Sequence, residues 1–135
     1  MNVDRIFETC LYANDLEEAE RFYREVLGLS VISRMKGRGI AFRCGRGVLL
    51  IFNPEQARIQ DREVPSHGAE GPGHVAFPVR DTELNACREH LARLGVKIET
   101  EVQWPEGGRS LYFRDPAGNS VELAPPTLWG FREEE

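Results

Sequence analysis

The sequence predicts an α+β fold in which two βαβββ modules pair into an open eight-stranded cup with the helices outside. Three observations lead to this prediction. The stretches ETCLYAND at 8–15 and HVAFPVRD at 74–81 share a pattern: a potential metal ligand, alternating apolar residues, then an acidic residue suited to begin a helix. An amphipathic segment follows each stretch and ends in Leu-Gly, at 27–28 and 94–95. Short strand-like segments then follow in both halves.

The first module is expected to span residues 1–53. Alternation predicts a strand over 5–12, and Asn14 with Glu17 forms a capping-box pattern at the start of a helix. Apolar residues at spacings of three and four make one helical stripe, and Gly28 is expected to end the helix. Three further strands, separated by glycine-containing turns, are predicted at 30–34, 40–44 and 48–53.

Residues 54–73 have little periodicity and many polar side chains, so they are expected to form a linker. The second module, 74–125, repeats the order of the first, and Asp81 is expected to cap its helix. The turn at 115–119, Asp-Pro-Ala-Gly-Asn, favours a tight connection. The tail, 126–135, is expected to pack its two aromatic residues on the domain and to leave its final glutamates in solvent. The strands of this module are predicted at 74–79, 97–103, 110–114 and 120–124.

Composition and charge narrow the possible functions. The chain has 135 residues, is 41% hydrophobic and carries a net charge of -5, which fits one soluble domain. The negative charge, without any basic stretch, argues against binding to nucleic acid or to an anionic membrane. No apolar run has membrane-spanning length, and the first residues lack the apolar core of a secretory signal. The three cysteines show no CxxC spacing. A reducing cytoplasm suits these cysteines, so a cytoplasmic protein is expected.

Three residues on different predicted strands are candidate metal ligands: Glu8, His74 and Glu122. When the two halves are aligned, Glu8 occupies the position equivalent to His74, and Glu122 the position equivalent to Leu50. Glu122 interrupts an apolar strand, and an interior carboxylate requires a cation or an open cavity wall. One imidazole and two carboxylates suit a divalent ion such as Fe²⁺, Mn²⁺, Ni²⁺ or Zn²⁺. Each residue also has a simpler interpretation. His74 could bond to the backbone, Glu122 could be a surface acid on an edge strand, and Glu8 could pair with an arginine.

Other polar residues are candidates for catalysis or substrate binding. His67 lies in a glycine-rich loop. It could serve as a fourth ligand or as a general acid/base, because imidazoles titrate near neutral pH; a solvated loop residue is the simpler interpretation. Tyr112 and Arg114 lie two apart on one predicted strand and could orient an anionic or phenolic substrate if Glu122 faces inward. Arg114 could equally pair with Asp115.

Three motifs carry a family resemblance: DLEEAERFYREVLGL after the first strand, GHVAFPVRD at the start of the second module, and YFRDPAGNSVEL near its end. With them the sequence resembles the vicinal oxygen chelate superfamily, which includes glyoxalase I, the bleomycin-resistance proteins, extradiol dioxygenases and fosfomycin-resistance thiol transferases. The similarity covers roughly residues 4–125 and supports the predicted cup.

The resemblance implies that metal ligands stand at positions 8, 50, 74 and 122. His74 and Glu122 match this pattern, Glu8 replaces a more usual histidine, and Leu50 cannot bind a metal. A three-ligand set, as in the dioxygenase and fosfomycin-resistance members, therefore fits better than the four-ligand set of glyoxalase I.

The implied protein is a metal-dependent dioxygenase, lyase or isomerase, or thiol transferase. Its metal would chelate two neighbouring oxygens of a small-molecule substrate, and the chain would form a homodimer. The alternative is a metal-free protein that sequesters a ligand, as the bleomycin-resistance proteins do. Metal content separates these two hypotheses.

Overall fold

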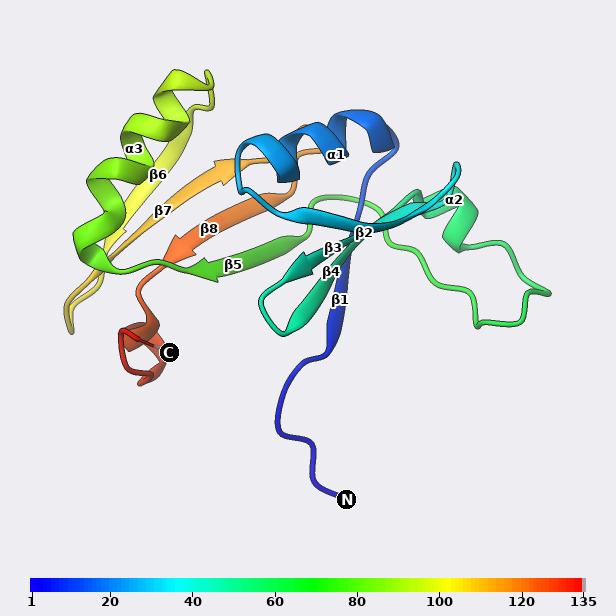
Figure 1. Ribbon diagram of the computed structural model, residues 1–135, viewed down its shortest axis with the longest axis horizontal. Helices are drawn as coiled ribbons and strands as arrows, with labels where there is room; N and C mark the ends of the chain where they lie inside the picture. The colour runs from blue at the N-terminus through cyan, green and yellow to red at the C-terminus, as the bar shows by residue number, and fades with distance from the viewer. Residues whose placement is uncertain (135) are drawn as a thin grey trace. The chain divides into compact units, whose positions relative to one another are not determined.

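The computed structural model describes residues 1–134 and divides into two units, the first ending at Gly71 and the second beginning at Pro72. Each unit holds one four-stranded sheet and one longer helix (Figure 1). The elements of unit 1 are β1 (Glu8–Tyr12), α1 (Leu16–Glu25), β2 (Ser30–Met35), β3 (Gly39–Cys44), β4 (Gly47–Phe52) and α2 (Pro54–Ala57). Those of unit 2 are β5 (His74–Pro78), η1 (Asp81–Glu83), α3 (Leu84–Arg93), β6 (Ile98–Gln103), β7 (Arg109–Arg114), β8 (Ser120–Ala124) and η2 (Pro126–Trp129).

The two sheets have the same topology. Their strand orders are β1-β4-β3-β2 and β5-β8-β7-β6, and in each the first strand runs parallel to the last. The same irregularity recurs as well, because the register shifts between Val31 and Ser33 in β2 and between Ile98 and Thr100 in β6. The α+β class and the doubled βαβββ order predicted from the sequence are therefore confirmed.

The starts of both long helices differ from the prediction. Asp15, rather than Asn14, caps α1, because its carboxylate accepts a hydrogen bond from the N–H of Glu18 at 3.1 Å. Asp81 does not cap α3. It begins the 3₁₀ turn η1, and its carboxylate pairs instead with Arg109 of β7.

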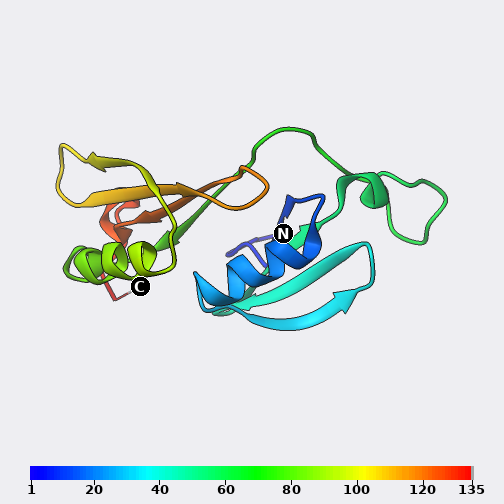
Figure 2. The ribbon, with the colours of Figure 1, turned by 90° about the horizontal axis from the view of Figure 1, so that it is seen from above.

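Each long helix covers one face of its own sheet (Figures 1 and 2). Tyr23 of α1 is fully buried, and its ring centroid lies 5.7 Å from that of Phe42 in β3. In unit 2, Leu91 of α3 and Phe113 of β7 are buried. Side chains alternate between the two faces of a strand, so the residues between these core positions point the other way. This opposite face, called the open face below, carries Glu8, Cys10 and Tyr12 in unit 1 and His74, Tyr112 and Glu122 in unit 2.

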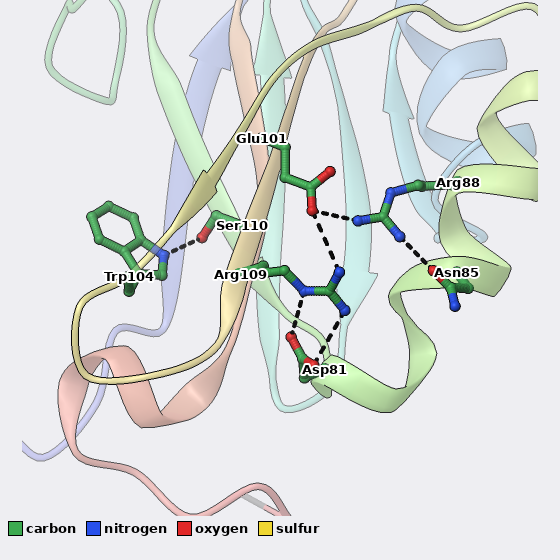
Figure 3. Close-up of polar contacts among 7 residues, drawn as sticks. All are labelled: Asp81, Asn85, Arg88, Glu101, Trp104, Arg109 and Ser110. Atoms are coloured by element: carbon green, nitrogen blue, oxygen red, sulfur yellow. Dashed lines mark hydrogen bonds and ion pairs between the residues drawn. The ribbon is translucent and has the colours of Figure 1, made fainter.

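Polar contacts also attach α3 to its sheet (Figure 3). Arg109 donates from Nε and Nη2 to the carboxylate of Asp81 at 3.2 and 3.3 Å. Its Nη1 lies 3.6 Å from Glu101, which also pairs with Arg88 of α3. Arg88 in turn donates to Asn85, one turn earlier in the helix. These charged groups lie on the helix side of β6 and β7, so they support the fold and leave the open face to other residues.

The segment predicted as a linker begins with a short helix. Asn53 caps α2, since its side-chain oxygen accepts from the N–H groups of Glu55 and Gln56. Residues 58–73 then continue without helix or strand (Figure 2).

The tail differs from the prediction. Trp129 and Phe131 are 79% and 58% exposed, so the expected packing of these aromatics is wrong. The turn η2 buries Pro126 instead. Glu133 and Glu134 are exposed as expected, and Glu135 lies outside the described residues.

Two further properties concern the chain as a whole. Cys10, Cys44 and Cys87 are all free and half-buried, so they form no disulfide framework. Burial is the main cause that raises the pKa of the Cys44 and Cys87 thiols. Among residues 1–134, no helix combines the length and the apolar character needed to cross a membrane.

Candidate metal centre

Strand pairing brings three predicted site residues together on the open face of unit 2. Glu122 of β8 stands between Ala76 of β5 and Tyr112 of β7. The Nε2 atom of His74 lies 3.2 Å from Oε1 of Glu122. The ring of Tyr112 stacks on the imidazole of His74, with centroids 6.4 Å apart and planes inclined by 21°. The two metal ligands predicted for the second module are therefore neighbours, with a phenol beside them.

The main chain fixes the orientation of His74. Its Nδ1 lies 3.1 Å from the carbonyl oxygen of Ser120, and a carbonyl only accepts, so Nδ1 carries a hydrogen. In a neutral imidazole, Nε2 then presents a lone pair to the carboxylate of Glu122. Two acceptors at this distance repel each other unless a cation joins them, either a proton on Nε2 or a metal ion bound by both. A histidine held by a carbonyl on its far nitrogen is the usual arrangement of a metal ligand.

The carboxylate of Glu122 is buried and incompletely hydrogen-bonded, so a cation would stabilise it. The residue is 5% exposed, and its Oε2 has no hydrogen-bond partner within residues 1–134. A buried carboxylate oxygen without a partner is costly. The repeat shows that the fold itself does not require an acid here: Cys10 pairs with Leu50 in unit 1 as Ala76 pairs with Glu122 in unit 2. The residues present therefore fit a divalent ion.

Tyr112, Ser110 and Trp104 extend the site along the open face of unit 2. Burial, and next a hydrogen bond with Glu122, raise the pKa of Tyr112, while a hydrogen bond with Ser110 lowers it in part. Tyr112 thus keeps its proton at physiological pH. Ser110 is fully buried, and its Oγ accepts from the indole N–H of Trp104 at 2.8 Å (Figure 3). Sequence reasoning missed Ser110 as a site residue, although its spacing of two from Tyr112 places it on the same face.

Arg114 forms a separate group of contacts. Its Nε and Nη2 donate to the carboxylate of Glu99 at 2.9 and 3.2 Å, and Nη1 donates to the carbonyl of Gly118 at 3.0 Å. Glu99, rather than Asp115, holds this guanidinium. Asp115 instead accepts hydrogen bonds from N–H groups of its own turn.

His67 is exposed, yet its ring contacts the open face of unit 1. Its Nδ1 lies 2.6 Å from the phenolic oxygen of Tyr12, and its ring meets Phe52 edge-on at 5.0 Å. The N–H of His67 donates to the carbonyl of Ala57 at 3.0 Å, which fixes the loop against the end of α2. Burial, and next a hydrogen bond with Cys10, raise the pKa of Tyr12 to about 12. A protonated Tyr12 donates to Nδ1, so the hydrogen of a neutral His67 imidazole lies on Nε2.

We expect Tyr12→Phe to remove one tyrosine ionisation centred near pH 12. A raised pKa means that the folded state holds the phenol proton more tightly than the unfolded chain does. The stability linked to Tyr12 is therefore complete below pH ~10, the ordinary tyrosine value, and decreases as pH rises toward the folded value. Absorbance at 295 nm measures the ionisation, and ¹⁵N NMR of His67 should show loss of the single tautomer. Loss of an ionisation centred near the ordinary tyrosine value of ~10 instead, or an unchanged His67 tautomer, would contradict the hydrogen bond.

Glu8 stands at the start of β1, opposite Val48, and is exposed. It belongs to unit 1, whereas His74 and Glu122 belong to unit 2. Within residues 1–134, no three His, Cys, Asp or Glu side chains lie together in an arrangement able to hold a metal ion. The structure thus brings together two of the three predicted ligands, His74 and Glu122, and the metal site as a whole, with Glu8 as third ligand, stays a prediction.

Known proteins resemble this chain over most of its length. A metallothiol transferase FosB of Lysinibacillus sphaericus is 28% identical over 95% of this chain and 86% of its own. A glutathione transferase FosA of Serratia marcescens is 29% identical over 84% of this chain and 74% of its own. The crystal structure of a lactoylglutathione lyase from Agrobacterium tumefaciens matches with a TM-score of 0.93 and 42% identity, over 97% of this chain and 100% of that one.

The family model described as the Glyoxalase/Bleomycin resistance protein/Dioxygenase superfamily matches residues 5–123. That range includes every strand of both sheets except the final residue of β8. The superfamily predicted from the three sequence motifs is therefore confirmed: the chain belongs to the glyoxalase/bleomycin resistance protein/dioxygenase superfamily, the vicinal oxygen chelate proteins.

Proposed function

We propose that this protein is a divalent-metal-dependent enzyme that acts on a small molecule. The observation that carries the proposal is the His74–Glu122 pair: Nδ1 of the histidine is held by a carbonyl, Nε2 faces the carboxylate, and the second carboxylate oxygen is buried without a partner among the described residues. His74 and Glu122 would hold the ion, with Glu8 as the third ligand. When bound, a divalent ion would supply Lewis-acid stabilisation of charge on neighbouring substrate oxygens.

Within the superfamily, the relatives support thiol transfer or a lyase reaction more than oxygen chemistry. Their names are metallothiol transferase, glutathione transferase and lactoylglutathione lyase, and each refers to a thiol or a glutathione derivative. We therefore propose that the substrate carries two neighbouring oxygens. It either reacts with a low-molecular-weight thiol or is itself the adduct of such a thiol. Consumption of a thiol or a thiol adduct is the expected activity, and metal-dependent oxygen uptake would instead indicate a dioxygenase.

The side chains of the open faces have distinct proposed tasks. The neutral phenol of Tyr112 forms a hydrogen bond with Glu122 and can contact a substrate oxygen. Its second hydrogen bond, with Ser110, limits the rotation of the phenol group. His67, which Tyr12 orients, is proposed as a general acid/base because its Nε2–H points away from the Tyr12 bond. Glu99 and the Gly118 carbonyl already engage Arg114, so substrate contact is assigned to Tyr112 rather than to Arg114.

Metal analysis of protein purified without chelator tests the proposal. About one divalent ion per chain is expected, with Fe²⁺, Mn²⁺, Ni²⁺ and Zn²⁺ as the candidates. Removal with EDTA should abolish activity, and the correct ion should restore it. Protein that contains no metal and binds none when supplied with each candidate would overturn the proposal and favour a metal-free ligand-binding protein.

A further inference from the structure

The turn between β7 and β8 contains a buried polar pair that the proposed chemistry does not use. Asp115 and Asn119 are 4% and 2% exposed. Asp115 Oδ1 accepts from the N–H of Asn119 at 2.8 Å, and its Oδ2 accepts from the side-chain amide of Asn119 at 2.9 Å. These two bonds fix the amide of Asn119, so its Oδ1 atom points in a defined direction.

That oxygen reaches a different strand. Asn119 Oδ1 accepts from the N–H of Gly73 at 2.7 Å, immediately before His74. The next residue, Ser120, donates its N–H to the carbonyl of Gly73 at 2.9 Å. The carbonyl of Ser120 then accepts from Nδ1 of His74 at 3.1 Å. Both the backbone that carries His74 and the carbonyl that orients its ring are therefore held by residues 119 and 120.

Comparison of the two units shows which contacts at the start of the first strand are common to both sheets and which occur in unit 2. In unit 1, the N–H of Val48 donates to the carbonyl of Phe7 at 3.0 Å, as Ser120 does to Gly73. The backbone bond is thus common to both sheets. The turn before β4 is Gly45-Arg46, with no asparagine, and the residue that follows Phe7 is the exposed Glu8. The side-chain bond from Asn119 is found where the strand presents a histidine.

We propose that Asn119, supported by Asp115, is a positioning residue for the metal ligand His74. It fixes the start of β5 against β8 so that Nδ1 stays bonded to the Ser120 carbonyl and Nε2 stays directed at Glu122. The assignment of His74 as a metal ligand rests on the proposed function, whereas the orientation of its ring can be measured in the metal-free protein.

Asn119→Ala tests this role, with Asn53→Ala as the matched control. The side-chain oxygen of Asn53 likewise accepts from the backbone, from two N–H groups at the start of α2 in unit 1. We expect Asn119→Ala to weaken Mn²⁺ binding about 10- to 100-fold, the usual effect of losing a group that orients a ligand. In ¹⁵N NMR of the metal-free variant, His74 should show both neutral tautomers. Asn53→Ala should lower the thermal midpoint and leave Mn²⁺ affinity and the His74 tautomer as in the wild type.

Two further variants keep the test decisive. Asn119→Ser, a smaller change that also removes the bond to Gly73, replaces Asn119→Ala if that variant does not fold. Asn119→Asp keeps an acceptor for the N–H of Gly73 but replaces the amide that donates to Oδ2 of Asp115 with a second carboxylate, so the two acids repel and His74 should again show both tautomers. Wild-type affinity and tautomer in Asn119→Ala or Asn119→Ser would refute the positioning role while leaving the metal site intact. If the wild type binds none of Fe²⁺, Mn²⁺, Ni²⁺ and Zn²⁺, while His74 shows both tautomers in these variants, the metal site is refuted and the positioning role is retained.

Discussion

Replacing His74 with alanine should lower the affinity for the native divalent ion by more than about 100-fold, since loss of a ligand exceeds the 10- to 100-fold effect of losing a group that only orients one. The imidazole supplies the one nitrogen donor of the proposed ligand set, and its Nε2 lies 3.2 Å from the carboxylate of Glu122. Activity should fall with the affinity. Isothermal titration with Mn²⁺ or Zn²⁺ measures the first effect, and thiol consumption at a metal concentration that saturates only the wild type measures the second.

His90→Ala is the matched control for this variant. His90 lies on α3, which covers the other face of the same sheet, so its loss should leave metal affinity within experimental error. Circular dichroism should show that both variants keep the secondary structure of the wild type. If His74→Ala binds the ion as tightly as His90→Ala does, His74 is not a ligand, and the proposed site is wrong.

The second large effect is expected in the opposite direction, on stability. Glu122→Leu should raise the free energy of unfolding of the metal-free protein by about 1–3 kcal/mol, the usual cost of a buried unsatisfied polar group. The substitution installs the residue that unit 1 already has at the corresponding position, Leu50. It also removes a buried carboxylate oxygen that has no partner within residues 1–134. Metal binding should be lost in the same variant. Urea unfolding of EDTA-treated protein measures the first effect.

Glu99→Leu provides the comparison for Glu122→Leu. Glu99 is a half-exposed acid on β6 that forms an ion pair with Arg114, so its replacement should not stabilise the fold and should leave metal binding unchanged. A Glu122→Leu variant less stable than the metal-free wild type would show that the carboxylate serves the fold, through Tyr112 or His74, and would weaken the case for a metal role.

Much of the fold could be predicted because its signals are local and repeated. Alternation along Ser120–Ala124 gave that strand its observed bounds, and the Leu-Gly pairs located the ends of both long helices. The predicted helix cap was wrong because two adjacent residues have side chains with similar capping ability. Asn14 and Asp15 can both cap a helix, and the choice depends on which oxygen reaches the N–H of Glu18. The exposure of Trp129 was not predictable, because the tail has no periodicity to indicate its direction.

The candidate site could be predicted only in part for a related reason. Glu122 interrupts an apolar strand and His74 begins one, and the match between the two halves predicted that they share a site. The bonds that orient them join residues distant in sequence, such as Asn119 with Gly73, and such bonds leave no periodic pattern. His67 shows the same difficulty, since its contact with Tyr12 depends on how the chain after α2 folds back onto the sheet.

The alternation of β8 has a consequence for divergence among related proteins. Val121 and Leu123 pair with Phe113 and Leu111 on the side of α3, while Glu122 between them points to the opposite side. Exchange of the middle residue can therefore change reactivity without repacking the hydrophobic interior. If Glu122 is a metal ligand, as proposed, a single substitution at this position would remove the ligand and leave the scaffold intact, which agrees with a superfamily whose name joins glyoxalases, bleomycin-resistance proteins and dioxygenases.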